Sequence, residues 1–166
     1  FNMSGYNSFL CGTFWFFRAL FVASLLFLVL FKVIRKSPRF ASNQQAGWAL
    51  LVCGLLLTLW KTTCGLHITG LAQGGYRELL GLSFMAAGFL LRQYNVIENL
   101  TWKIALPSIV LLLVASFFFP SSMAFNGTTI DLVSIFLPAI AAFLAIAYGS
   151  QFIDRHNTLL KRSLVH

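Results

Sequence analysis

The chain has 166 residues, of which 58% are hydrophobic and only 10% are charged, less than half the charged fraction of an ordinary soluble domain. Lys and Arg outnumber Asp and Glu by twelve to four, which gives a formal net charge of +8. These cations stand at the ends of apolar runs instead of on a polar face, which disfavours a nucleic-acid-binding protein. We therefore expect an all-α, polytopic integral membrane helix bundle of about five transmembrane helices, with the lipid bilayer as a partner and no nucleic acid.

The first predicted span runs from Thr13 to Phe31. The residues before it, FNMSGYNSFLC, lack a cationic segment and a long apolar run, so they indicate an interfacial loop and not a signal peptide. Lys32, Arg35 and Lys36 follow the span, and the positive-inside rule assigns such an end to the cytoplasm. We expect the Phe1 side of the chain to be extracytoplasmic.

The second and third predicted spans are Ala46–Trp60 and Tyr76–Leu91. The segment between them, Lys61–Gly75, is expected to be an extracytoplasmic loop, and a loop of this length is often functional or mobile. The third span is rich in small residues, and Gly81 and Gly88 fall close to one stripe that would let neighbouring helices approach. We expect it to be a packed, interior helix.

The fourth and fifth predicted spans are Trp102–Phe119 and Ile130–Ile146, and Pro138 lies in the middle of the fifth. The tail after the fifth span carries Arg155, Lys161 and Arg162, so the His166 side is expected to be cytoplasmic. All cation-rich ends then lie on one side of the membrane, and we expect a single membrane domain over residues 1–166.

Four polar residues are candidates for a substrate site. Arg18 lies about one turn inside the first span, where it either lines a substrate pathway or snorkels to the nearby interface. Arg77 and Glu78 open the third span; an interior ion pair between Glu78 and Arg18 and ordinary interfacial charges are both open interpretations. His67, in the predicted loop, has the right side chain for a general base but is more often simply a loop residue.

The sequence gives no sign of a metal or redox centre, because Cys11, Cys53 and Cys64 lack the spacing of such sites. It also lacks a Gly-rich phosphate loop and the HExxH and GxSxG motifs. We therefore expect no metal, and no catalytic group can be assembled within this chain.

Three segments resemble the acyltransferase family 3 membrane proteins, in that family's order and over nearly the whole chain. GTFWFFRALFVASLLFLVLFKVIRK is similar to one family helix, through Trp15, Phe16, Phe17, Leu20 and Phe21. GGYRELLGLSFMAAGFLLRQY resembles a later helix, through Arg77, Glu78, Leu79, Leu80, Phe84, Gly88, Phe89 and Leu90. YGSQFIDRHNTLLKRSLVH is similar to the segment that leads into the last helix of the family.

The resemblance implies the C-terminal half of a longer acyltransferase domain without its last helix, in the bacterial inner (plasma) membrane. It implies transfer of an acyl group from acyl-CoA, usually acetyl-CoA, to a hydroxyl of a sugar or polysaccharide, with no bound cofactor. The catalytic histidine would lie in earlier helices, so a fragment of these residues alone is expected to be inactive. Arg18, Arg77, Glu78 and His67 would then bind the glycan acceptor.

A non-enzymatic membrane protein, either a small-solute transporter or an assembly subunit, is the alternative. A transporter is expected to show paired broken helices with polar residues near the midplane, and the spans here are poor in polar residues at their centres. Nothing in the sequence indicates an oligomeric state.

Overall fold

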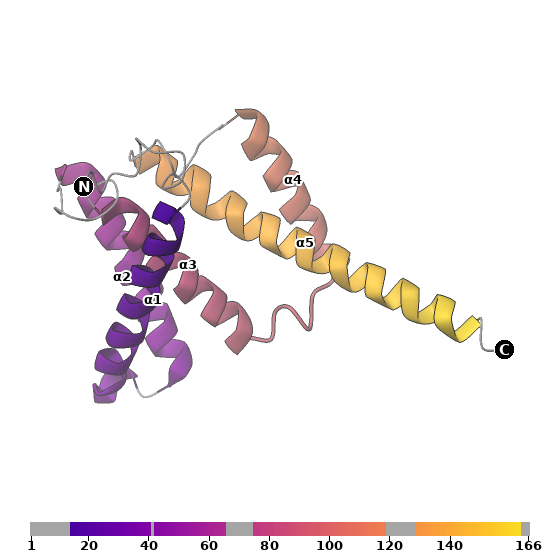
Figure 1. Ribbon diagram of the computed structural model, residues 1–166, viewed down its shortest axis with the longest axis horizontal. Helices are drawn as coiled ribbons and strands as arrows, with labels where there is room; N and C mark the ends of the chain where they lie inside the picture. The colour runs from indigo at the N-terminus through magenta and orange to yellow at the C-terminus, as the bar shows by residue number, and fades with distance from the viewer. Residues whose placement is uncertain (1–13, 41, 66–74, 119–128, 164–166) are drawn as a thin grey trace. The chain divides into compact units, whose positions relative to one another are not determined.

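The computed structural model describes residues 14–40, 42–65, 75–118 and 129–163, with side chains described for 17–40, 42–65, 75–118 and 133–154. Most of these residues are helical, and there is no strand among them, as the composition predicts (Figure 1). Five α-helices and one short 3-10 helix occur: α1 Phe14–Arg35, η1 Pro38–Phe40, α2 Asn43–Cys64, α3 Tyr76–Gln93, α4 Trp102–Phe118 and α5 Thr129–Ser163. Two compact units are distinguished, and α1, η1, α2 and α3 belong to the first.

The limits of α2 differ from the predicted span Ala46–Trp60 at both ends. At its start, the Ser42 hydroxyl accepts a hydrogen bond from the Gln45 backbone N–H (3.1 Å), and the Gln45 side chain bonds back to the Ser42 N–H. This capping box satisfies amides that the first turn leaves without helical partners. At its end, the helix continues through Cys64 and stops at Gly65, whose φ of 62° suits a glycine. The expectation of a loop from Lys61 was therefore wrong for Lys61–Cys64.

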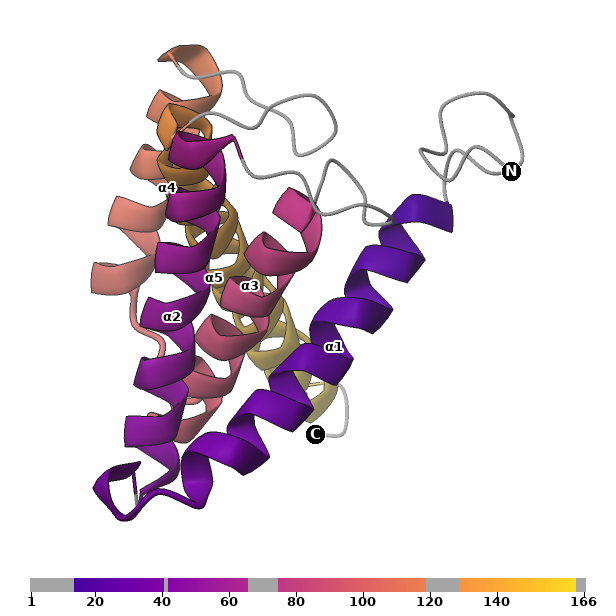
Figure 2. The ribbon, with the colours of Figure 1, turned by 90° about the vertical axis from the view of Figure 1, so that its left-hand side faces the viewer.

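The first unit consists of α3 with α1 and α2 packed on it, as Figure 2 shows. Helices α1 and α3 are parallel, because Ala23 approaches Gly81 and the Phe31 ring stacks edge-on against Phe89 (centroids 5.1 Å apart). Helices α2 and α3 are antiparallel, because Gly47 approaches Phe89 and Leu90 whereas Gly54 approaches Ser83. The end of α2 therefore lies beside the start of α3.

Close helix contacts in this unit depend on three glycines. A Cβ at Gly54 would lie 2.6 Å from the Ser83 hydroxyl, one at Gly47 would lie 2.9 Å from Leu90, and one at Gly81 would lie 3.0 Å from the Ala23 Cβ. A Cβ at Gly88 would meet nothing within 4 Å. The predicted stripe therefore holds at Gly81 but not at Gly88, although α3 itself is an interior helix, as expected.

The second unit contains α4 and most of α5. Pro107 and Pro138 lie inside these helices without ending them, which membrane helices tolerate. The side chain of Gln151 on α5 donates a hydrogen bond of 2.6 Å to the carbonyl of Ile97, just before α4. Helix α5 extends well beyond the predicted span Ile130–Ile146, so the cationic tail continues the same helix.

Three helical segments are long and apolar enough to cross a membrane: Phe17–Arg35, Asn43–Cys64 and Val133–Asp154. Helix α4 is apolar but shorter. Helix α3, which carries Arg77, Glu78 and Arg92, is not among the long apolar segments. The described residues thus form an integral membrane protein of helical-bundle class.

Candidate functional site

Arg77 and Glu78 lie in the first turn of α3, and both are buried. Arg77 is 2% exposed and Glu78 is fully buried. The helix begins after Gly75, whose φ of 97° is a left-handed conformation that few other residues adopt. A carboxylate in a first turn is stabilised by the positive end of the helix dipole, which suits Glu78 to this position. Arg77 and Glu78 are therefore interior side chains and not ordinary interfacial charges.

Lys61 approaches these residues from the last turn of α2. Its Nζ lies 5.6 Å from the centroid of the Tyr76 ring, and the ammonium interacts electrostatically with Glu78. An ammonium above an aromatic face is attracted by the negative face of the ring. We call Lys61, Tyr76, Arg77 and Glu78 the polar cluster.

Lys61 was not predicted as a site residue, because it belongs to the segment Lys61–Gly75 that was expected to be a loop. In the structure the helix continues past Lys61, and the Thr62 and Thr63 hydroxyls donate hydrogen bonds to the Leu59 carbonyl one turn back. Because α2 includes Lys61 and packs antiparallel to α3, Lys61 lies beside the start of α3.

Arg18 is half-buried in the first turns of α1. Ala23 is at the level of Gly81, and the two helices run parallel, so five residues earlier Arg18 is at about the level of Tyr76. The structure therefore brings Arg18 to the same end of the first unit as the polar cluster. The ion pair between Arg18 and Glu78 remains a prediction.

The other sequence candidates contribute less. His67 and Cys11 lie outside the described residues. Cys53 and Cys64 are free thiols. In the part of the chain that the structure describes, no three His, Cys, Asp or Glu side chains come together in a way that could hold a metal ion.

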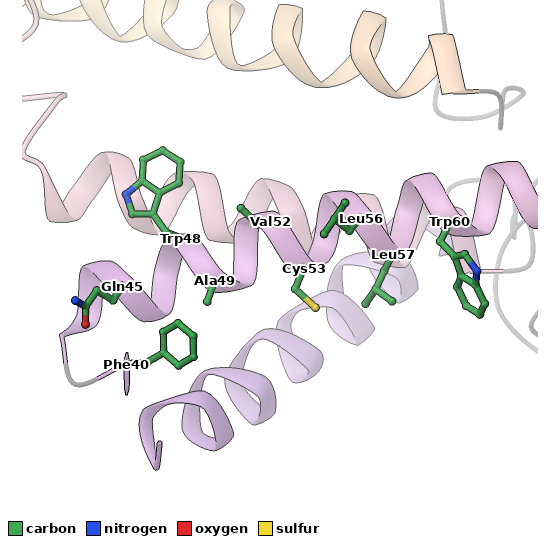
Figure 3. Close-up of a pocket in the computed structure, with 9 residues that line it drawn as sticks. All are labelled: Phe40, Gln45, Trp48, Ala49, Val52, Cys53, Leu56, Leu57 and Trp60. Carbon is green, nitrogen blue, oxygen red and sulfur yellow. The ribbon is translucent and has the colours of Figure 1, made fainter. Parts of the chain in front are cut away.

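A groove runs along α2 from Gln45 to Trp60, with Phe40 of η1 at one end (Figure 3). Its volume is about 750 Å³, and apart from Gln45 and Cys53 its lining is apolar. The lining residues are Phe40, Gln45, Trp48, Ala49, Val52, Cys53, Leu56, Leu57 and Trp60. The groove offers apolar contact, whereas the polar cluster offers charges and hydrogen-bonding groups.

Comparison with known proteins gives one family. The family model of acyltransferase family 3, described as an acyltransferase domain, matches residues 3–162. No curated protein and no solved structure matches the chain.

Proposed function

The chain belongs to acyltransferase family 3, and from this premise we propose that it serves the transfer of an acetyl group from acetyl-CoA to a hydroxyl of a cell-surface sugar or polysaccharide. Its membrane helices and its family support a membrane acyltransferase in general. The observation that carries the finer proposal is the burial of Arg77 and Glu78 at one end of the first unit. Such groups suit a sugar ligand, because a carboxylate accepts hydrogen bonds from its hydroxyls and a guanidinium donates hydrogen bonds to its oxygens.

In the proposed reaction the acyl group passes from the sulfur of acyl-CoA to a hydroxyl oxygen of the acceptor. The acceptor oxygen attacks the thioester carbon, the new C–O bond forms, the C–S bond breaks, and the hydroxyl proton passes through a base to the departing thiolate. A base is required because a sugar hydroxyl is a weak nucleophile at neutral pH. The resemblance implies that this base is a histidine of the family in helices other than those described, so the groups here are proposed to bind and orient the acceptor.

Glu78 is the proposed hydrogen-bond acceptor for the sugar, and Arg77 and Arg18 are the proposed donors. Glu78 and Arg77 are shielded from solvent, and electrostatic and hydrogen-bonding interactions are stronger in such a low-dielectric site than in water. A sugar hydroxyl held between a carboxylate and a guanidinium has few free orientations, which favours attack on a fixed thioester. His67 is proposed as a further acceptor-binding residue on sequence grounds alone.

We also propose that the protein lies in the bacterial plasma membrane with the polar cluster on the extracytoplasmic side. Lys32 and Arg35 stand in the last turn of α1, at the end opposite Arg18, and the positive-inside rule assigns that end to the cytoplasm. The acyl donor would then be supplied from the cytoplasmic side and the glycan acceptor from the other.

The test uses the full-length protein encoded by the gene, in membrane vesicles supplied with radiolabelled acetyl-CoA and the glycan fraction of the source membrane. Glu78→Gln and Arg18→Ala are expected to lower acetyl transfer at low acceptor concentration by about 10- to 100-fold, since each removes a charged hydrogen-bonding group. Glu98→Gln is the matched control, because Glu98 is exposed and belongs to the second unit. Unchanged transfer in both Glu78→Gln and Arg18→Ala would refute the assignment of the site.

A further inference from the structure

Lys61 and Glu78 come from different helices, and the fold brings them together. Lys61 stands in the last turn of α2, and Glu78 stands in the first turn of α3. The antiparallel register set by Gly47 and Gly54 places these two turns side by side. The distance of 5.6 Å between the Lys61 Nζ and the Tyr76 ring centroid shows that the ammonium lies against the first turn of α3.

Glu78 is a fully buried carboxylate, and a nearby cation favours a buried charge. Arg77 and Arg18 lie at the same end of the first unit, and Lys61 adds a third cation from α2. Lys61 approaches this turn from the opposing helix, and its ammonium lies within electrostatic range of Glu78. Lys61 is therefore placed to act on Glu78 from α2, across the interface between the two helices.

We propose that Lys61 is a positioning residue for acceptor binding: its ammonium, held over the Tyr76 ring, keeps the Glu78 carboxylate oriented toward the sugar hydroxyl. The inference rests on the proposed function, because it assigns a role to Lys61 through Glu78. Lys61 itself touches neither the acceptor nor the reacting atoms. The Tyr76 ring matters because it restricts the long lysine side chain, which otherwise has many rotamers.

The experiment measures kcat and the acceptor KM for acetyl transfer in vesicles, with rates normalised to the amount of folded protein. Lys61→Met is expected to raise the acceptor KM about tenfold with a smaller change in kcat, as when a charged hydrogen-bonding group loses its orientation. Lys61→Arg keeps a cation at this point and should retain most of the activity. Lys61→Met in a Glu78→Gln background should add little, because Lys61 acts through Glu78. Lys103→Met, at an exposed lysine of α4, is the matched control.

A charge-swapped variant, Lys61→Glu with Glu78→Lys, separates positioning from structure. The swap keeps an opposite-charge pair, so the amount of folded protein should recover relative to either single change, but the acceptor KM should stay raised because the carboxylate has left α3. Recovery of the wild-type acceptor KM in the swapped protein would overturn the positioning role. The swapped variant gives this answer even where Lys61→Met fails to accumulate.

The outcomes also distinguish this inference from the proposed function. If Glu78→Gln impairs acceptor binding while Lys61→Met matches the wild type, the role of Lys61 is wrong and the site stands. If Glu78→Gln has no effect on the acceptor KM, the acceptor site itself is wrong, and the inference falls with it.

Discussion

Replacing Gly81 by alanine should separate α1 from α3. A Cβ at Gly81 would lie 3.0 Å from the Cβ of Ala23, and the Ala23 side chain is fully buried. Contacting carbon atoms prefer a separation of about 3.5–4.0 Å. The Ala23 Cβ is attached directly to the backbone and cannot rotate away, so α1 itself must shift by about half an ångström or more.

The size of the effect follows from two opposing contributions. Overpacking of a tight contact costs about 1–3 kcal/mol. Exchanging glycine for alanine inside a helix contributes up to about 1 kcal/mol in the other direction. Gly81→Ala should therefore lower the free energy of unfolding by about 0–3 kcal/mol. Gly88→Ala is the matched control on the same helix, because its Cβ would meet nothing within 4 Å, and it should raise stability by up to about 1 kcal/mol.

The assay is thermal unfolding of the purified protein in detergent micelles, followed by the fraction that stays monodisperse at a fixed heating rate. A change of 1 kcal/mol shifts the midpoint by about 2–4 °C for a chain of this size. The Gly81→Ala protein should thus melt about 2–12 °C below the Gly88→Ala protein. Adding Ala23→Gly to Gly81→Ala should recover part of the loss by removing the opposing methyl group. Equal melting of the two alanine variants would refute the packing argument.

Three further predictions concern α2 and the ends of the first unit. Ser42→Ala removes the capping box and should lower stability by about 1 kcal/mol in the same thermal assay; an unchanged midpoint would contradict the cap. Trp48→Phe and Tyr94→Phe each remove the 3.1 Å hydrogen bond between the indole N–H and the phenol oxygen, so each should cost about 1 kcal/mol and the double variant little more than either; additive losses would count against the bond. An impermeant maleimide added from outside intact cells should label Cys64, which is exposed, and leave Cys53 largely unlabelled; labelling of Cys64 only after permeabilisation would reverse the proposed orientation.

The helical class was predictable because apolar periodicity and length are local properties, but the helix limits were less so. The sequence placed the end of α1 at Phe31, where the apolar run stops, whereas the helix continues to Arg35. Lys and Arg side chains can extend their charged groups into water while their backbone stays helical. The end of an apolar run therefore does not mark the end of a helix. At the start of α2, the Ser-x-x-Gln pattern from Ser42 was a readable signal for an earlier start.

The candidate site was predictable only in part, for a related reason. Arg77 and Glu78 stood out because charges are rare inside apolar runs. Lys61 did not, because its importance depends on the register of α2 against α3. That register is set by where glycines allow close approach, and the sequence does not show that Gly54 meets Ser83 while Gly88 meets nothing. Pairing between helices is a tertiary property that one sequence does not specify by pattern alone.

The least apolar helix of the first unit is also its most buried one, and this inversion explains how the polar cluster can exist in a membrane. Only 11% and 22% of the residues in the apolar segments of α1 and α2 are buried, whereas nine of the 18 residues of α3 are buried. In a bilayer the outer surface must be apolar, so a helix that carries Arg77 and Glu78 is stable only where other helices cover it. The covering helices α1 and α2 supply lipid-facing residues on one side and small residues toward α3 on the other. The same close packing that covers α3 holds a carboxylate and a guanidinium in a water-poor site, where electrostatic and hydrogen-bonding interactions are strongest.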